Sequence, residues 1–233
     1  MLRGFDLDIA SRDYVVQGFP RSGNTFLAML LKEFAARPVN IFTHLHVPAM
    51  FTLALENDKT IFMPVREPLG SVVSLIQMKG WSCGRALDHY VEYYTNAQRF
   101  IDRVQVMDFK NFTRDIPLAL QIIEQHSGIP YKKPASHEKA EERVFALIDE
   151  LNIRRTGVIR VNDLHRPHAG RQAGKSAIVA ILRARHAEKL LQCEALYEQF
   201  AVCCLMRRHI TARTQNEHSV DVVPVIEVSA NPA

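Results

Sequence analysis

Short apolar runs alternate with longer amphipathic segments along the first half of the chain. The apolar runs have the length of strands and lie at Tyr14–Gln17, Val39–Phe42, Ile61–Val65 and Val104–Asp108. Between them, apolar residues recur at helical spacing, as they do from Phe26 to Phe34. Because strands that alternate with helices favour crossover connections, the pattern predicts a single-domain α/β fold with a central, mostly parallel sheet flanked by helices.

The second half of the chain is predicted to be mainly helical. Helices are expected over Arg85–Ile101, Ile116–His126 and Glu138–Leu151, and a long helix or a broken pair over Ile178–Ile210. Residues 162–176 are rich in Gly, His, Arg and Lys and are predicted to form a loop. We expect the domain to span residues 1–212, followed by a tail of residues 213–233 that adds a strand or is partly disordered.

The turn after the first apolar run carries the strongest functional signal. It reads Gly18-Phe19-Pro20-Arg21-Ser22-Gly23-Asn24-Thr25, and a helix is predicted to follow it. A helix N-terminus offers unpaired backbone N–H groups and the positive end of the helix dipole, and both attract phosphate. Arg21 adds a positive charge, and Ser22, Asn24 and Thr25 add side-chain donors. The segment therefore predicts a phosphate-binding loop.

A second turn of the same kind follows the third apolar run. Arg66 ends that run, and Pro68 suits the first turn of a helix, where its missing N–H costs nothing. Ser74 lies two turns into this helix, so Arg66 and Ser74 could converge on one anion. Ligands of parallel sheets bind at the carboxyl ends of the strands, which is where Arg21, His44, Arg66 and Phe109 are all predicted to lie. We therefore expect one shared site.

The spacing from Gly18 to Thr25 also fits the outline of a Walker A loop. However, Asn24 stands where that motif has the lysine that contacts the β- and γ-phosphates. A P-loop nucleotide kinase or NTPase is one alternative function, because the run that ends at Asp108 is similar to a strand that presents a magnesium-binding aspartate. A nucleotide-binding protein without catalysis is another.

Both turns resemble motifs of the sulfotransferase family that uses 3′-phosphoadenosine-5′-phosphosulfate (PAPS). Phe19–Phe26 resembles the family's 5′-phosphosulfate loop, and Arg66–Ser74 resembles its 3′-phosphate motif with the Arg-to-Ser spacing kept. Thr43-His44-Leu45 is similar to the stretch that carries the catalytic base, although Phe42 replaces a lysine and His46 a proline. Phe109 stands in for a tyrosine near the adenine. The resemblance covers roughly residues 14–112.

The resemblance implies transfer of a sulfuryl group from PAPS to a hydroxyl or amine of a small-molecule or glycan acceptor. Adenosine 3′,5′-diphosphate (PAP) would be the product, and no metal is expected. It implies a set of donor-binding residues: Arg21, Ser22, Gly23, Asn24, Thr25 and Phe26 at the 5′-phosphosulfate, Arg66 and Ser74 at the 3′-phosphate, and Phe109 beside the adenine.

The same resemblance implies the residues of catalysis. Arg21 would stabilise charge on the leaving oxygen, and His44 would be the general base, with His46 as the alternative. Among the basic residues of 165–175, Arg171 is expected to reach the 3′-phosphate. Trp81 could line the acceptor pocket, but a core or interface position is favoured for it.

The composition narrows the range of partners and compartments. The 233 residues carry a formal charge of +4, which suits an anionic ligand but falls short of the basic stripe that nucleic acids require. No apolar run approaches the length of a membrane span, and acidic residues occur near the N-terminus where a secretory signal would be apolar. Four cysteines lack metal-site spacing. We therefore expect a cytoplasmic protein without nucleic-acid or membrane partners.

Overall fold

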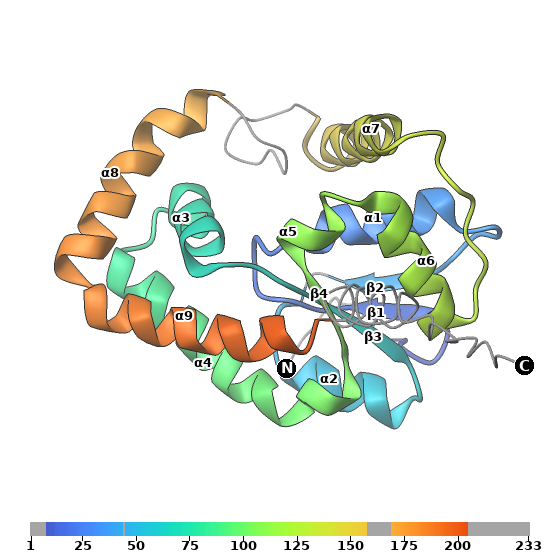
Figure 1. Ribbon diagram of the computed structural model, residues 1–233, viewed down its shortest axis with the longest axis horizontal. Helices are drawn as coiled ribbons and strands as arrows, with labels where there is room; N and C mark the ends of the chain where they lie inside the picture. Colours follow the sequence, from blue (N-terminus) through green and yellow to red (C-terminus); the bar gives the residue numbers. More distant parts are fainter. Residues whose placement is uncertain (1–7, 44, 158–168, 205–233) are drawn as a thin grey trace, which may run out of the picture.

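The computed structural model describes residues 8–43, 45–157 and 169–204. Its centre is a four-stranded sheet, in the order β2-β1-β3-β4, in which every neighbouring pair is parallel (Figure 1). The strands are β1 (Tyr14–Val16), β2 (Ile41–Thr43), β3 (Thr60–Val65) and β4 (Gln105–Asp108). All four coincide with the predicted apolar runs, so the prediction of an α/β fold with a parallel sheet is confirmed.

Helices cover both faces of this sheet. They are α1 (Asn24–Phe34), α2 (Ala49–Glu56), α3 (Pro68–Lys79), α4 (Cys83–Ala97), α5 (Phe109–Phe112), α6 (Ile116–Ser127), α7 (His137–Thr156), α8 (Ala169–Arg185) and α9 (Ala187–Val202), with a 3₁₀ turn η1 (Gln98–Arg103). In Figure 1, α1, α5, α6 and α7 lie on one side of the sheet, and α2, α4 and α9 lie on the other. Helix α3 packs against α4 and α8.

The register explains why a proline is tolerated inside β3. Strand β1 pairs with β3 only as far as Val16, which lies opposite Phe62. Pro64 is therefore beyond the end of that ladder, where its missing N–H takes no hydrogen bond away from β1. On the other side of β3 the pairing with β4 continues through Pro64 to Val65, which lies opposite Asp108.

The prediction of a loop over residues 162–176 is wrong for its second half, because α8 begins at Ala169. The part before Ala169 lies outside the described residues. Glycine disfavours helix, but tertiary packing overrides this preference here. Leu182 of α8 is fully buried, and α8 packs against α3.

The expected long helix or broken pair is a broken pair. Helix α8 ends at Arg185, and α9 begins at Ala187, with His186 between them. Residues 205–210 of the predicted segment and the tail of residues 213–233 lie outside the described residues. None of the helices in the described part of the chain combines the length and the apolar character that crossing a bilayer requires.

The strand order creates a crevice at the carboxyl ends of β1 and β3. From β1 the chain passes through α1 to β2 on one flank, and β3 leads through α3 and α4 to β4 on the other flank. The connections after β1 and β3 therefore diverge, and ligands of parallel sheets bind where connections diverge in this way. Arg21 and Arg66 both lie in these diverging connections.

The first connection packs tightly against β3, which gives a test of the fold. A Cβ added to Gly18 would lie 2.2 Å from the carbonyl oxygen of Pro64. Gly18→Ala should therefore lower the free energy of unfolding by about 1–3 kcal/mol, measured by urea denaturation. The control is Gly84→Ala in α4, where the nearest atom to an added Cβ is 3.7 Å away. This control should be neutral or stabilising by up to about 1 kcal/mol. Equal stability of Gly18→Ala and wild type would contradict the packing.

Candidate functional site

The loop between β1 and α1 is held in shape by the side chain of Asn24. The Gly18 N–H donates to Asn24 Oδ1 at 2.7 Å, and Asn24 Nδ2 donates to the Phe19 carbonyl oxygen at 2.9 Å. Asn24 is only 4% exposed. Its amide is therefore used to brace the loop, while its backbone N–H belongs to the first turn of α1. Gly23 precedes that turn with φ 94°, and no side chain caps the helix. The N-terminus of α1 thus keeps the unpaired N–H groups and the positive dipole end that attract an anion.

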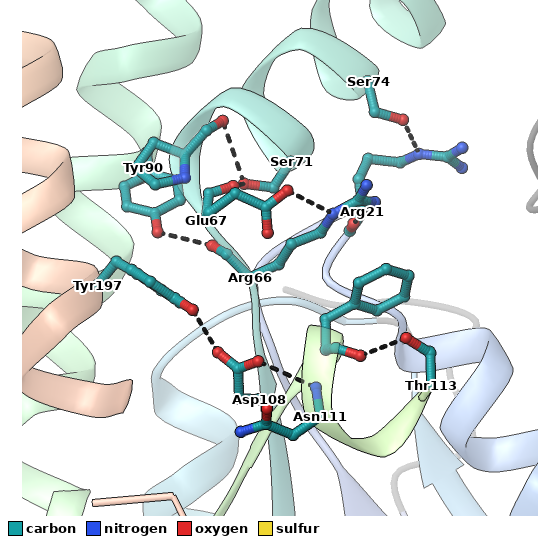
Figure 2. A network of polar contacts seen from close by, with 12 residues as sticks. Arg21, Arg66, Glu67, Ser71, Ser74, Tyr90, Asp108, Asn111, Thr113 and Tyr197 are labelled. Atoms are coloured by element: carbon teal, nitrogen blue, oxygen red, sulfur yellow. Dashed lines mark hydrogen bonds and ion pairs between the residues drawn. The ribbon is translucent and has the colours of Figure 1, made fainter. Parts of the chain in front are cut away.

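Arg21 is fixed in this loop by contacts with α3. Its backbone has φ 68°, in the left-handed region that non-glycine residues rarely adopt. Arg21 Nε donates to Ser74 Oγ at 2.8 Å, and Nη1 lies 3.7 Å from the sulfur of Met78. Figure 2 shows the Arg21 side chain extended toward Ser74. Strained backbone of this kind persists only where surrounding contacts enforce it. It concentrates at functional sites.

Arg66 bridges the second turn to the first. Its Nη1 donates to the carbonyl oxygen of Arg21 at 3.2 Å, and its Nε lies 3.5 Å from Glu67 Oε1 (Figure 2). The guanidinium carbon lies 4.3 Å from the centroid of the Phe109 ring. At Gly70 an added Cβ would lie 2.5 Å from Arg66 Nε, so this glycine makes room for the side chain. The two arginines therefore lie side by side.

Both arginines line one cavity of about 550 Å³, a size typical of small-molecule sites. One end is formed by α3 and the short segment after it: Leu75, Met78, Lys79 and Trp81, with His46 also lining the cavity. The other end is formed by α5 and α7 with the start of α1: Phe26, Phe109, Thr113, Glu141 and Phe145. The described lining contains four cations, Arg21, Arg66, Lys79 and Arg155, and one acid, Glu141. The cavity is therefore suited to an anionic ligand.

Most of the predicted donor-binding residues lie together in this lining. Those that line the cavity are Arg21, Gly23, Asn24, Thr25, Phe26, Arg66 and Phe109. Ser22 is fully buried and is not among the lining residues. Ser74 contacts the site through the hydrogen bond that its hydroxyl accepts from Arg21. The sequence had instead predicted that Ser74 would bind an anion together with Arg66.

Two predicted residues cannot be placed in the same way. His44 lies outside the described residues. Arg171 belongs to α8 and not to the loop in which it was predicted, and its side chain is outside the described part of the structure.

His46 is held at the edge of the loop between β1 and α1. Its backbone has φ 51°, and its Nδ1 lies 2.8 Å from the carbonyl oxygen of Gly18. Because a carbonyl oxygen only accepts, Nδ1 carries the proton, and Nε2 is the acceptor nitrogen of the neutral ring. Burial lowers the pKa of His46; the bond to Gly18 opposes this, and the charges of His89 and Lys79 reinforce it. The ring is therefore neutral near pH 7.

Sequence reasoning missed the contribution of α7. Glu141, Phe145 and Arg155 line the cavity from this helix, more than a hundred positions after the loop. Their spacing places them on one helical face, but the same spacing is common in any amphipathic helix. No local signal distinguishes a face that lines a site from one that packs on the core. Trp81 also lines the cavity, although the sequence favoured a core or interface position for it over the acceptor pocket.

Asp108, the candidate magnesium ligand of the alternative kinase function, is engaged elsewhere. Its Oδ1 accepts from the Asn111 N–H at 3.2 Å, and its Oδ2 accepts from the Tyr197 hydroxyl (Figure 2). The residue is 4% exposed and is not among the lining residues of the cavity. Its carboxylate thus caps α5 and anchors α9. Among the described residues, no group of three or more His, Cys, Asp or Glu could hold a metal ion.

Comparisons with protein-family models, with curated proteins and with solved structures found no significant match to this chain.

Proposed function

We propose that this protein is a sulfotransferase that moves a sulfuryl group from PAPS to a hydroxyl or amine of a small-molecule or glycan acceptor. The observation that carries the proposal is the meeting of the Arg21 and Arg66 turns in one cationic cavity. PAPS has two separate anionic groups on one adenosine. Two cationic turns that lie next to each other at the ends of adjacent strands match that distribution of charge.

The residues of the loop have distinct roles in this proposal. The N–H groups at the start of α1, with the Thr25 hydroxyl, hold the 5′-phosphate, and Arg66 holds the 3′-phosphate. The acceptor oxygen attacks sulfur, the bond from sulfur to the phosphate oxygen breaks, and the acceptor proton passes to a base. Arg21 stabilises the negative charge that develops on the leaving oxygen. Because arginine stays protonated, its contribution is electrostatic and not that of an acid.

Two histidines are candidates for the base. His44 is the residue that the family resemblance implies. His46 is supported by its place in the cavity lining and by the bond that leaves Nε2 as its basic nitrogen. The acceptor proton would move to that nitrogen during attack, a step that typically contributes about 10²–10⁴-fold to the rate.

The alternative kinase function is less well supported by the same residues. Asn24 is a neutral brace of the loop where a kinase has its lysine, and both carboxylate oxygens of Asp108 accept hydrogen bonds from other residues. We also propose a cytoplasmic location. The cysteines in the described part of the chain, Cys83, Cys193, Cys203 and Cys204, are free thiols, as is usual in a reducing compartment.

Calorimetry with the Arg66→Ala variant tests the donor. Loss of a charge-assisted hydrogen bond of about 1.5–3 kcal/mol should weaken PAP binding by about 10- to 100-fold. ATP, which has no 3′-phosphate, should be affected much less. Magnesium should not be required for PAP binding.

The matched control is Arg103→Ala, because Arg103 is exposed and precedes β4, at the opposite end of the sheet from the cavity. It removes the same charge and should leave PAP affinity unchanged. Tighter binding of ATP than of PAP, or an equal effect of Arg66→Ala on both nucleotides, would contradict the proposal.

Rate measurements on His44→Ala and His46→Ala, with labelled PAPS and a panel of phenols, alcohols, sugars and amines, identify the base. The variant that removes the base should lose about 10²–10⁴-fold in rate while retaining PAP affinity. If His46 is the base, the rate should fall as the pH drops through its pKa, because protonation removes the acceptor nitrogen. That fall should lie below pH 6.5, since the pKa of His46 is lowered from 6.5. Unchanged rates in both variants would exclude a histidine base at either position.

A further inference from the structure

One carboxylate stands out in the cationic cavity. Glu141 is the one acid among the described lining residues, and the cations there are Arg21, Arg66, Lys79 and Arg155. Its side chain is partly buried, and no hydrogen bond or ion pair joins it to another residue in the described part of the chain. A carboxylate repels phosphate and accepts hydrogen bonds. This part of the cavity is therefore suited to a ligand group that donates.

Aromatic residues line the same cavity as this carboxylate. Phe145 follows Glu141 by one turn of α7, and Phe26 packs edge-on against Phe145 with the ring centroids 5.5 Å apart. Phe109 lines the same end of the cavity. Arg155 lies 14 positions further along α7 (155 − 141), about 21 Å along the helix axis, too far to neutralise Glu141. The α5/α7 end thus combines flat apolar surfaces with one unpaired acceptor.

The two ends of the cavity differ in chemistry, and this difference decides which end takes the base of a bound nucleotide. The phosphates take the middle of the cavity, where the start of α1 and the two arginines are. At the α3 end, Leu75, Met78, Lys79 and Trp81 offer apolar walls and a cation, and the Trp81 ring is already covered by the Arg85 guanidinium at 4.2 Å. The acceptor at this end, the His46 ring, is a candidate base of the proposed reaction. A purine has two π faces and, in adenine, an exocyclic amino group. The α5/α7 end complements both features.

The geometry points to Glu141 as the residue that reads the base of the nucleotide. Its carboxylate accepts a hydrogen bond from the exocyclic amino group of adenine, while Phe26, Phe109 and Phe145 form the apolar surround of the ring. The inference rests on the proposed function, because it takes the phosphates to lie at Arg21 and Arg66. Inosine carries a carbonyl oxygen in place of the amino group. At that position Glu141 would then face a second acceptor, and the N1–H of inosine would reach the carboxylate only if the base shifted in the site.

Calorimetry with matched nucleotides tests this assignment. Wild type should bind adenosine 3′,5′-diphosphate about 10- to 100-fold more tightly than inosine 3′,5′-diphosphate. Glu141→Gln should reduce this ratio to within a few-fold of one, because the amide can donate to the inosine oxygen. The matched control is Glu142→Gln, on the exposed neighbour in α7, which should keep the wild-type ratio. Thermal unfolding of both variants checks that they fold.

The outcomes separate this assignment from the proposed function. A wild-type ratio near one, or an unchanged ratio in Glu141→Gln, overturns the assignment while PAP binding that depends on Arg66 still supports the sulfotransferase. If the protein prefers ATP to PAP, the proposed function fails, and the ratio of ATP to inosine triphosphate affinity then tests Glu141 in the same way. Absence of binding by all four nucleotides overturns both.

Discussion

The cavity depends on a hydrogen bond between the two arginine-bearing turns. Arg66 Nη1 donates to the carbonyl oxygen of Arg21 at 3.2 Å. The turns follow β1 and β3, which are neighbours in the sheet, so the strand pairing fixes their separation and this bond fixes their orientation. The acceptor is a backbone atom, and its position is set by the strained φ of Arg21. The backbone strain and the placing of Arg66 are therefore parts of the same arrangement.

Bringing two guanidinium groups into one cavity has an electrostatic consequence. Like charges repel, and the repulsion grows as solvent is excluded. The side chain of Arg66 is 22% exposed, and its near neighbours include the Glu67 carboxylate at 3.5 Å and the face of Phe109. The contacts of Arg21 include the neutral hydroxyl of Ser74 and the thioether of Met78. A bound anion relieves this repulsion, which favours a doubly charged ligand over a neutral one.

Local signals made the strands and both turns predictable. One apolar run precedes Gly18 and another precedes Arg66, and a glycine or proline follows each of them within three residues. This pattern indicates a strand followed by a helix, and it does not depend on distant contacts. Asn24 was more difficult, because an amide in a phosphate loop looks like a ligand donor, and only the folded loop shows both of its polar atoms bonded to backbone. The start of α8 and the lining residues of α7 depend on packing between segments far apart in sequence. A pattern of nearby residues does not contain that information.

The stacking of Arg66 on Phe109 has a directional consequence for recognition. With the ring covering one face of the guanidinium, and with Nη1 and Nε turned toward Arg21 and Glu67, the group meets the cavity through its remaining planar edge. An oxyanion that arrives in that plane finds N–H vectors aimed at its lone pairs. Soft, diffuse ions that prefer a flat side of a guanidinium find one of its two flat sides already occupied. Compact, hard oxyanions are favoured by shape before their charge is considered.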